Sequence, residues 1–249
     1  MAGHCRIPRY FTNEREITLK NGREQGAVLS VLKGRVGLEN RQDFVVGLTG
    51  GIGAGKSAVA GFLREEYGVR IIDADCVCRD LLRLHARGWL ALKKHFGNKF
   101  LQADGLIDRR RLRSALFEDK NLRQQLDGVL HPLVREEITS MVHYFAVHGG
   151  NRKLIVEVPL LFEAHWEHDF AKIVVVYAGN DQCRERLIRR DRVSPREAAI
   201  AIDSQWPLAD KALRADHVID NSGVWPDTCL QVAHLYGLLW GETDDKSPA

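Results

Sequence analysis

Eight consecutive residues have the composition and spacing of a phosphate-binding loop. They fit the pattern G-x-x-x-x-G-K-S and are Gly50, Gly51, Ile52, Gly53, Ala54, Gly55, Lys56 and Ser57. Glycines let several backbone N–H groups face phosphate oxygens, the lysine reaches the β- and γ-phosphates, and the serine hydroxyl ligates Mg²⁺. This run therefore predicts a nucleoside triphosphate site, with Ser57 as a ligand of Mg²⁺.

Two aspartates follow the next apolar run. Asp73 and Asp75 come directly after residues 69–72, which are typical of a strand. Carboxylates at the carboxyl end of a parallel strand lie where open α/β sheets bind ligands. If the strand continues, both point to one face, so that one acts as a general base while the other orients Mg²⁺ or its waters. The alternative is that Asp73 caps the next helix.

A third acid, Glu157, interrupts the apolar run 154–158. An ionised glutamate in such a strand is costly unless it is paired or lies near a metal. We therefore expect Glu157 near the Mg²⁺ region, acting through water. A purely structural role is the alternative.

The stretch 182–214 is polar and rich in arginine. Within it, Ser194 and Pro195 with Glu197 mark a helix N-terminus. Two helices joined by a short turn would form a lid whose arginines close over a triphosphate, neutralise charge and exclude water. An arginine-rich surface helix is the alternative.

The elements around these residues indicate an α/β fold with a parallel sheet. A helix is expected at 58–67, directly after the glycine loop, and mainly helical patterns fill the region between the aspartates and residue 154. The predicted strands span 44–48, 69–72, 154–158 and 173–177, with an edge or final strand at 218–219.

Length, composition and charge narrow the class of protein. The chain has 249 residues, of which 45% are hydrophobic and 28% charged, as in an ordinary globular protein. Its net charge of +3 is weaker than a sequence-independent nucleic-acid binder usually shows, so no nucleic-acid partner is expected. No apolar run approaches the roughly 20 residues that span a bilayer. Residues 1–43 mix acids with bases and contain no apolar stretch of signal-peptide type, so we expect an extension of unknown role and a cytoplasmic location.

Taken together, the motifs resemble the dephospho-CoA kinase family. The discriminating runs are D-A-D at 73–75, L-H-P at 130–132 and V-P-L-L-F-E at 158–163, because many kinases share the phosphate loop. The resemblance covers roughly residues 44–240. Other family-like segments occur in the expected order at 47–57, 105–109, 186–187, 190–191, Gln205 and 215–221.

The resemblance implies ATP-dependent phosphorylation of the ribose 3′-hydroxyl of dephospho-CoA, the last step of coenzyme A biosynthesis. It also implies a P-loop NTPase core with a parallel sheet flanked by helices, a helical acceptor-binding subdomain and a small helical lid. The corresponding ranges are a core at about 44–75, 151–180 and 215–240, an acceptor subdomain at about 76–150, a lid at about 181–214 and a tail at 241–249.

The resemblance also implies roles for individual residues. Asp75 is placed as the base, the lid arginines Arg186 and Arg190 beside the triphosphate, and Asn221 at the adenine edge. The acceptor-binding set is Asp73, Asp75, Arg109, His131, Pro159 and Leu160. His131 has the alternative of a packing role at a helix start, and Arg109 that of lying on the solvated face of a helix.

Some positions depart from the family pattern. Ala54 and Ala58 replace a Ser and a Thr, Glu157 stands where an Asp or an apolar residue is more usual, and Ala201 is found near the place of a lid arginine. Two other functions remain open. One is a P-loop kinase that phosphorylates another small hydroxylated metabolite or a nucleotide. The other is a nucleotide-dependent binding or regulatory module whose basic segments contact nucleic acid. The oligomeric state is also open.

Overall fold

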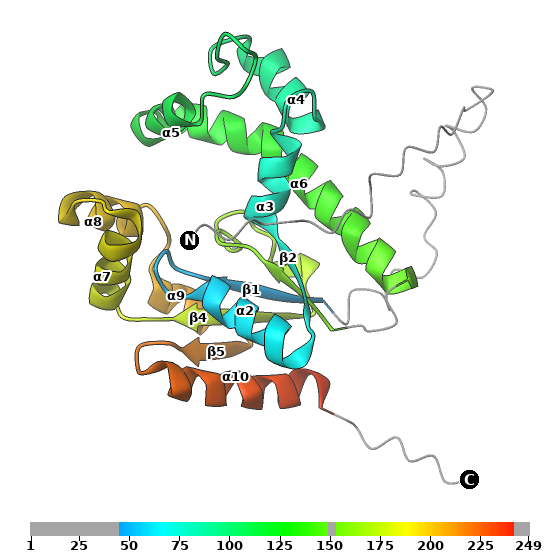
Figure 1. Ribbon diagram of the computed structural model, residues 1–249, viewed down its shortest axis with the longest axis vertical. Coiled ribbons are helices and arrows are strands. Elements are labelled where there is room, and N and C mark those ends of the chain that lie inside the picture. The colour runs from blue at the N-terminus through cyan, green and yellow to red at the C-terminus, as the bar shows by residue number, and fades with distance from the viewer. Residues whose placement is uncertain (1–44, 149–152, 242–249) are drawn as a thin grey trace. The chain divides into compact units, whose positions relative to one another are not determined.

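The computed structural model describes residues 45–148 and 153–241 (Figure 1). Three sequence predictions therefore lie wholly or largely outside the described residues: the extension at 1–43, the start of the first strand at Phe44, and the tail at 241–249.

Five parallel strands form one sheet in the order β2-β3-β1-β4-β5. They are β1 (Val45–Gly50), β2 (Arg70–Asp73), β3 (Leu154–Glu157), β4 (Lys172–Tyr177) and β5 (His217–Asp220). Every residue of β1 and β3 is buried, as expected for inner strands of a parallel sheet covered on both faces. The predicted strands are confirmed, with β1 continuing to Gly50 and β2 ending at Asp73.

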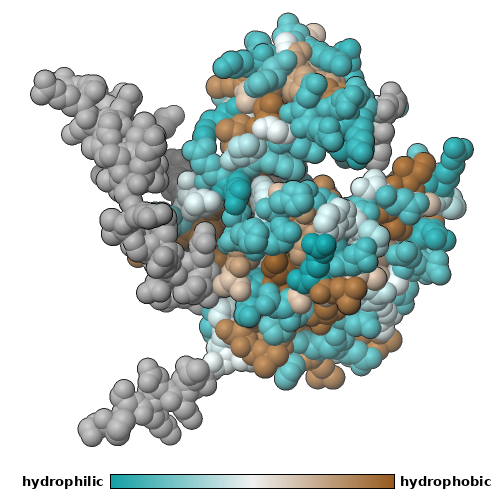
Figure 2. Space-filling model, turned by 180° about the vertical axis from the view of Figure 1, so that it is seen from behind, coloured by the Kyte–Doolittle hydropathy of each residue, from teal (hydrophilic) through white to brown (hydrophobic). Residues whose placement is uncertain are grey.

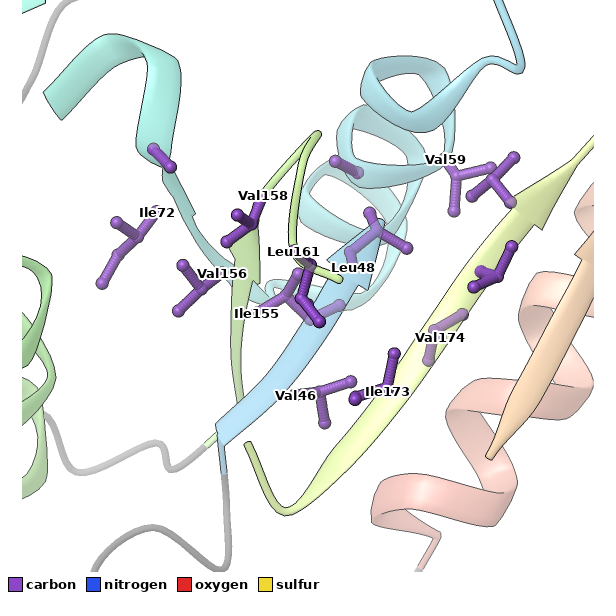
Figure 3. Packing of buried hydrophobic residues seen from close by; sticks show 14 of the residues in the cluster. Val46, Leu48, Val59, Ile72, Ile155, Val156, Val158, Leu161, Ile173 and Val174 are labelled. Atoms are coloured by element: carbon purple, nitrogen blue, oxygen red, sulfur yellow. The ribbon is translucent and has the colours of Figure 1, made fainter. Parts of the chain in front are cut away.

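Two helices pack together beside the sheet. They are α2 (Lys56–Tyr67) and α10 (Trp225–Trp240). Phe62 of α2 meets Trp225 of α10 edge to face, with ring centroids 5.9 Å apart. Figure 3 shows the buried side chains of the sheet, among them Val46, Leu48 and Val156, beside Val59 of α2. The short helix α9 (Leu208–Leu213) packs against β4.

Four helices follow β2 and carry an apolar cluster of their own. They are α3 (Ala74–Leu81), α4 (Arg87–Phe96), α5 (Arg109–Glu118) and α6 (Lys120–His148). The long helix α6 contributes Leu126 and Leu130 to this cluster, and Val134 and Ile138 to the core beneath the sheet. Helix α6 therefore ties the helical region to the sheet.

Two further helices form the predicted lid region. They are α7 (Asn180–Asp191) and α8 (Pro195–Asp203). Outside this region, a 3₁₀-helix, η2, lies at Glu167–Asp169 between β3 and β4. The predicted start of α8 is confirmed, because Ser194 and Glu197 form a reciprocal capping box and Pro195 is the first helical residue. Figure 2 shows a notch in the surface between the α4–α5 end of the helical region and the α7–α8 region.

Candidate active site

The predicted phosphate loop connects β1 to α2 at the carboxyl end of the sheet. Gly55, the residue before α2, has φ of 100°, and Gly53 has φ of 79°. A Cβ on Gly55 would lie 2.2 Å from Asn221 Nδ2, and one on Gly53 would lie 2.5 Å from the carbonyl oxygen of Cys183. Glycine is therefore required at both positions by conformation and by space. Helix α2 begins at Lys56 and directs its positive end into the loop.

Lys56 lies folded back along the loop. Its Nζ donates to the carbonyl oxygens of Gly50 at 3.1 Å and Gly51 at 2.9 Å. Burial lowers the pKa of the Lys56 ammonium, whereas the negative charges of Glu157 and Asp75 oppose this change. The two carbonyl contacts keep the cation at the mouth of the loop, where phosphate oxygens can replace the carbonyl oxygens.

Ser57 and Glu157 meet beside the loop. Ser57 Oγ donates to Glu157 Oε1 over 2.9 Å, so the residue predicted to ligate Mg²⁺ contacts the acid expected near it. Burial raises the pKa of Glu157, and the hydrogen bond from Ser57 acts in the opposite direction. Among residues 45–148 and 153–241, no group of three or more His, Cys, Asp or Glu side chains is arranged to hold a metal.

The two aspartates after β2 have different positions, because the strand does not continue to Asp75. Strand β2 ends at Asp73, whose Oδ1 accepts from the backbone N–H groups of Asp75 at 2.8 Å and Cys76 at 3.1 Å. Asp73 is thus the N-cap of α3, which was the alternative that the sequence left open. Asp75 lies in the first turn of α3 and is exposed, although surrounding protein and the charge of Asp73 raise its pKa.

These acids share one edge of the sheet. Asp73 at the end of β2 is in register with Glu157 at the end of β3. Glu157 and Asp75 both act electrostatically on Lys56. The structure therefore brings together Lys56, Ser57, Asp73, Asp75 and Glu157.

Arg186 of α7 and Asn221, which follows β5, both contact the loop. The Arg186 guanidinium donates to the carbonyl oxygens of Asn221 at 2.8 Å and Ala54 at 3.4 Å. Asn221 Nδ2 also donates to the Ala54 carbonyl, at 2.8 Å. The Asn221 side chain, predicted to contact adenine, thus supports the loop backbone.

Sequence reasoning missed Thr228. This threonine of α10 is fully buried, and its Oγ1 donates to Asn221 Oδ1 at 3.0 Å. A polar residue on the buried face of a helix was the one available signal, and it is a weak one, because such residues often cap or back-bond instead.

Arg190 is exposed and forms an ion pair with its neighbour Asp191, with Nε 2.7 Å from Oδ1. Of the two predicted lid arginines, Arg186 contacts the phosphate loop, whereas Arg190 contacts Asp191.

The remaining predicted residues lie in the helical region and directly after β3. Arg109 is the exposed first residue of α5. His131 is half-buried inside α6, not at a helix start as the alternative supposed, and its Nε2 lies 3.6 Å from Asp127 Oδ1. Pro159 accepts a hydrogen bond from Thr49 through its carbonyl oxygen, and Leu160 is exposed.

Lys211 also lies within the stretch 182–214, but it does not belong to a solvated face. Its side chain is fully buried, and Nζ lies 2.7 Å from Glu163 Oε1. The helix α9 that carries it packs on β4 rather than over the loop mouth. A buried lysine is rare without a partner, and its partner here comes from the V-P-L-L-F-E run.

None of the helices in the described part of the chain is long and apolar enough to cross a membrane.

Comparisons with known proteins agree with the resemblance. A sequence model of the dephospho-CoA kinase family matches residues 44–227. A dephospho-CoA kinase domain-containing protein of Danio rerio is 38% identical over 197 residues, which are 79% of this chain and 85% of that protein. The dephospho-CoA kinase of Geobacillus kaustophilus is 36% identical over 187 residues, 75% of this chain and 92% of the relative.

Two solved structures are similar over nearly their whole length. TT1252 from Thermus thermophilus has a TM-score of 0.66 at 28% identity, and the alignment covers 77% of this chain and 94% of that one. A dephospho-CoA kinase from Campylobacter jejuni has a TM-score of 0.57 at 26% identity, with the same coverage.

Proposed function

This chain belongs to the dephospho-CoA kinase family and is thus an ATP-dependent kinase of the final step of coenzyme A biosynthesis, and we propose that the site at the carboxyl end of its sheet phosphorylates the ribose 3′-hydroxyl of dephospho-CoA. The observation that carries the proposal is the meeting of three functions at one edge: the loop with Lys56, the Ser57–Glu157 contact and the exposed acid Asp75.

Asp75 is the proposed general base. Its neighbour Asp73 is occupied in capping α3, whereas Asp75 is exposed to solvent in the first turn. Because its pKa is raised, Asp75 is a stronger proton acceptor than an ordinary aspartate once it is ionised. The 3′-hydroxyl proton passes to an Asp75 carboxylate oxygen as the hydroxyl oxygen bonds to the γ-phosphorus. The bond from that phosphorus to the β,γ-bridging oxygen breaks, and ADP leaves.

The loop and the lid arginines bind and neutralise the phosphates. Lys56 exchanges the carbonyl oxygens of Gly50 and Gly51 for β- and γ-phosphate oxygens, and backbone N–H groups of the loop hold the rest. Arg186, which contacts the loop, and Arg190, one turn later on α7, are proposed to oppose charge on the transferred group. We propose a lid at about 181–214 that excludes water and so limits ATP hydrolysis.

Mg²⁺ is the proposed metal, and the oxygen donors at Ser57 and Glu157 fit it. A hard cation that keeps waters and phosphate oxygens needs few protein ligands, which suits a hydroxyl beside one buried carboxylate. Ser57 would hold the ion directly and Glu157 through water. Bound there, Mg²⁺ would neutralise phosphate charge.

The acceptor is proposed to bind in the helical region at about 76–150, against Asp73, Arg109, His131, Pro159 and Leu160. Arg109 and the other exposed arginines at the start of α5 suit the diphosphate of the acceptor.

We also propose that Asn221 lies at the edge of the adenine ring. The modest net charge of +3 supports small-molecule partners without nucleic acid, and a cytoplasmic location is proposed.

The proposal is tested by measuring ADP release from Mg·ATP with and without dephospho-CoA, with Lys56→Ala as the control. Strong stimulation by dephospho-CoA that is lost in Lys56→Ala is the expected result. The product should carry its new phosphate on the ribose 3′-oxygen. If ATP binds but dephospho-CoA changes nothing, the acceptor assignment fails; ADP release stimulated equally by another hydroxylated metabolite would favour a different kinase.

A further inference from the structure

A closed circuit of polar contacts lies behind the phosphate loop, outside the groups assigned to chemistry. We call it the loop brace, and its members are Thr49, Ile52, Pro159, Glu163, Gln205, Trp206 and Lys211. The circuit starts at Thr49, near the end of β1, and ends at Ile52, three residues later in the loop. Three other segments of the sequence, the V-P-L-L-F-E run, residues 205–206 and Lys211, therefore hold one short stretch of the loop.

One half of the brace starts at Thr49. Thr49 Oγ1 donates to the Pro159 carbonyl oxygen at 3.3 Å, and Lys211 Nζ approaches the same oxygen at 3.4 Å. Thr49 and Lys211 are both fully buried. The carbonyl of the V-P-L-L-F-E run thus joins the end of β1 to helix α9.

The other half passes through Glu163. Its Oε1 accepts from Lys211 Nζ at 2.7 Å and from the Trp206 backbone N–H at 3.0 Å. Glu163 Oε2 is buried and has no hydrogen-bond partner among the residues that the structure describes. The carboxylate therefore depends on Lys211 for neutralisation, and its bond to Trp206 fixes the α8–α9 connection.

Gln205 closes the circuit on the loop. Its Oε1 accepts the backbone N–H of Ile52 at 2.9 Å. A Cβ on the neighbouring Gly51 would lie 3.3 Å from the side chain of Leu208, so α9 also approaches the loop closely. We propose that Gln205 is a positioning residue: held by the Glu163–Lys211 pair, it keeps the first half of the phosphate loop in the shape that receives ATP.

This inference rests on the proposed function, because it assigns a role in binding ATP. A loop that is already in its binding shape gives up little conformational freedom when the phosphates arrive. A loop that visits other shapes binds ATP more weakly in proportion to the time it spends in them. The brace should therefore affect ATP affinity, not the transfer step.

Gln205→Met tests the proposal, because methionine keeps the length of the side chain and removes the acceptor. A cavity of about 250 Å³ is lined by Ile52, Gln205 and Trp206, so water can reach the released N–H and the fold should survive. We expect the Kd and KM for ATP to rise about three- to tenfold, the range for net loss of one hydrogen bond. The kcat at saturating ATP and the KM for dephospho-CoA should stay within about twofold of wild type. That change is smaller than the change expected from the loss of one hydrogen bond.

Gln231→Met is the matched control. Gln231, on α10, is also half-buried, and its Oε1 accepts the Asp220 backbone N–H at the same distance of 2.9 Å. Its Nε2 donates to the carbonyl oxygens of Asp220 and Asp227, and neither residue belongs to the loop. An unchanged ATP affinity in Gln205→Met, a loss of kcat without loss of affinity, or an equal loss in Gln231→Met would each overturn the proposal. If Gln205→Met does not melt cooperatively, Gln205→Ala provides the same test without added bulk. Failure of the wild type to bind ATP would instead refute the proposed function.

Discussion

Ser57 Oγ lies 2.9 Å from Glu157 Oε1, and this contact joins the first turn of the helix after the phosphate loop to the neighbouring strand. It places a buried carboxylate directly behind the hydroxyl proposed to hold Mg²⁺. A group in that position orients the ligand and raises its affinity for the metal.

We expect Glu157→Gln to weaken Mg²⁺ activation. Glutamine keeps the size and one acceptor oxygen but loses the charge, and loss of such a partner typically costs 10- to 100-fold in metal affinity or activity. The measurement is the Mg²⁺ concentration for half-maximal turnover at fixed ATP. Glu136→Gln, which changes an exposed glutamate paired with Arg87, should leave this concentration unchanged. Equal Mg²⁺ dependence in both variants would remove Glu157 from the metal site.

A comparison of Asp75→Asn with Asp73→Asn should distinguish the general base from the residue that caps α3. We expect kcat to fall by at least about 100-fold, within the usual contribution of a general base, while the Kd for ATP is retained. Asp73→Asn instead weakens the cap of α3, because an amide accepts less strongly than a carboxylate, and should cost at most about 1 kcal/mol of unfolding free energy. Single-turnover kinetics and urea unfolding of both variants decide the matter. Near-normal turnover in Asp75→Asn would transfer the base role to Asp73 or abolish it.

The pH dependence of the reaction should report on this pair of acids. A base must be ionised, so kcat/KM for dephospho-CoA falls as the pH drops through the pKa of Asp75, which the surrounding protein and the charge of Asp73 raise. Asp73→Asn removes the neighbouring negative charge, lowers the pKa of Asp75 and should shift the acid limb to lower pH. Asp227→Asn, an exposed change in the first turn of α10, should not move it. A shift in the opposite direction would contradict the assignment.

The strand, glycine loop and helix were predictable because local sequence specifies them. Gly53 and Gly55 have left-handed backbone, and Gly55 is a fixed position of the loop pattern. The capping box of α8 is likewise written in four consecutive residues. The parallel strands, buried on both faces, carry the continuous apolar runs that identify them.

Other features depend on contacts distant in sequence. Strand β2 stops at Asp73 because that side chain accepts two N–H groups of the next turn, and alternation of strand residues cannot anticipate this. Lys211 is buried because Glu163 lies 2.7 Å away, although the pair is separated by nearly fifty residues. His131 is inside α6, where Pro132 suggested a helix start.

The Glu163–Lys211 pair should dominate the stability of the region around α9. Lys211→Met leaves a buried carboxylate unneutralised, for which the expected cost is about 3–5 kcal/mol of unfolding free energy. Lys172→Met breaks an ion pair of similar length, 3.0 Å to Asp216, but half-exposed, and should cost about 0–1 kcal/mol. Urea unfolding measures both.

The double variant Glu163→Gln/Lys211→Met distinguishes a charge effect from a packing effect. It removes both charges and keeps an acceptor for the Trp206 N–H, so it should recover most of the stability lost in Lys211→Met. A double variant as unstable as the single one would mean that the lysine acts through its packing alone.

Gly55→Ala should disable the phosphate loop without unfolding the protein. Alanine at φ of 100° is strained by about 1–3 kcal/mol, and its Cβ would lie 2.2 Å from Asn221 Nδ2. Asn221 would have to move, and its bond to the Ala54 carbonyl would break. Because the loop N–H groups then lose their alignment, we expect at least about a tenfold weaker Kd for ATP, as from the loss of one or more hydrogen bonds.

Gly61→Ala is the matched control for this loss. Gly61 lies inside the same helix, α2, and the nearest atom to its added Cβ, Arg64 Nη2, is 4.0 Å away. Alanine is a better helix former there, so the free energy of unfolding should rise by about 0.5–1 kcal/mol with unchanged ATP affinity. Calorimetric titration with ATP and thermal melting of both variants give the comparison. Wild-type affinity in Gly55→Ala would show that the loop tolerates a side chain at the helix start and that its left-handed glycine is not needed for binding.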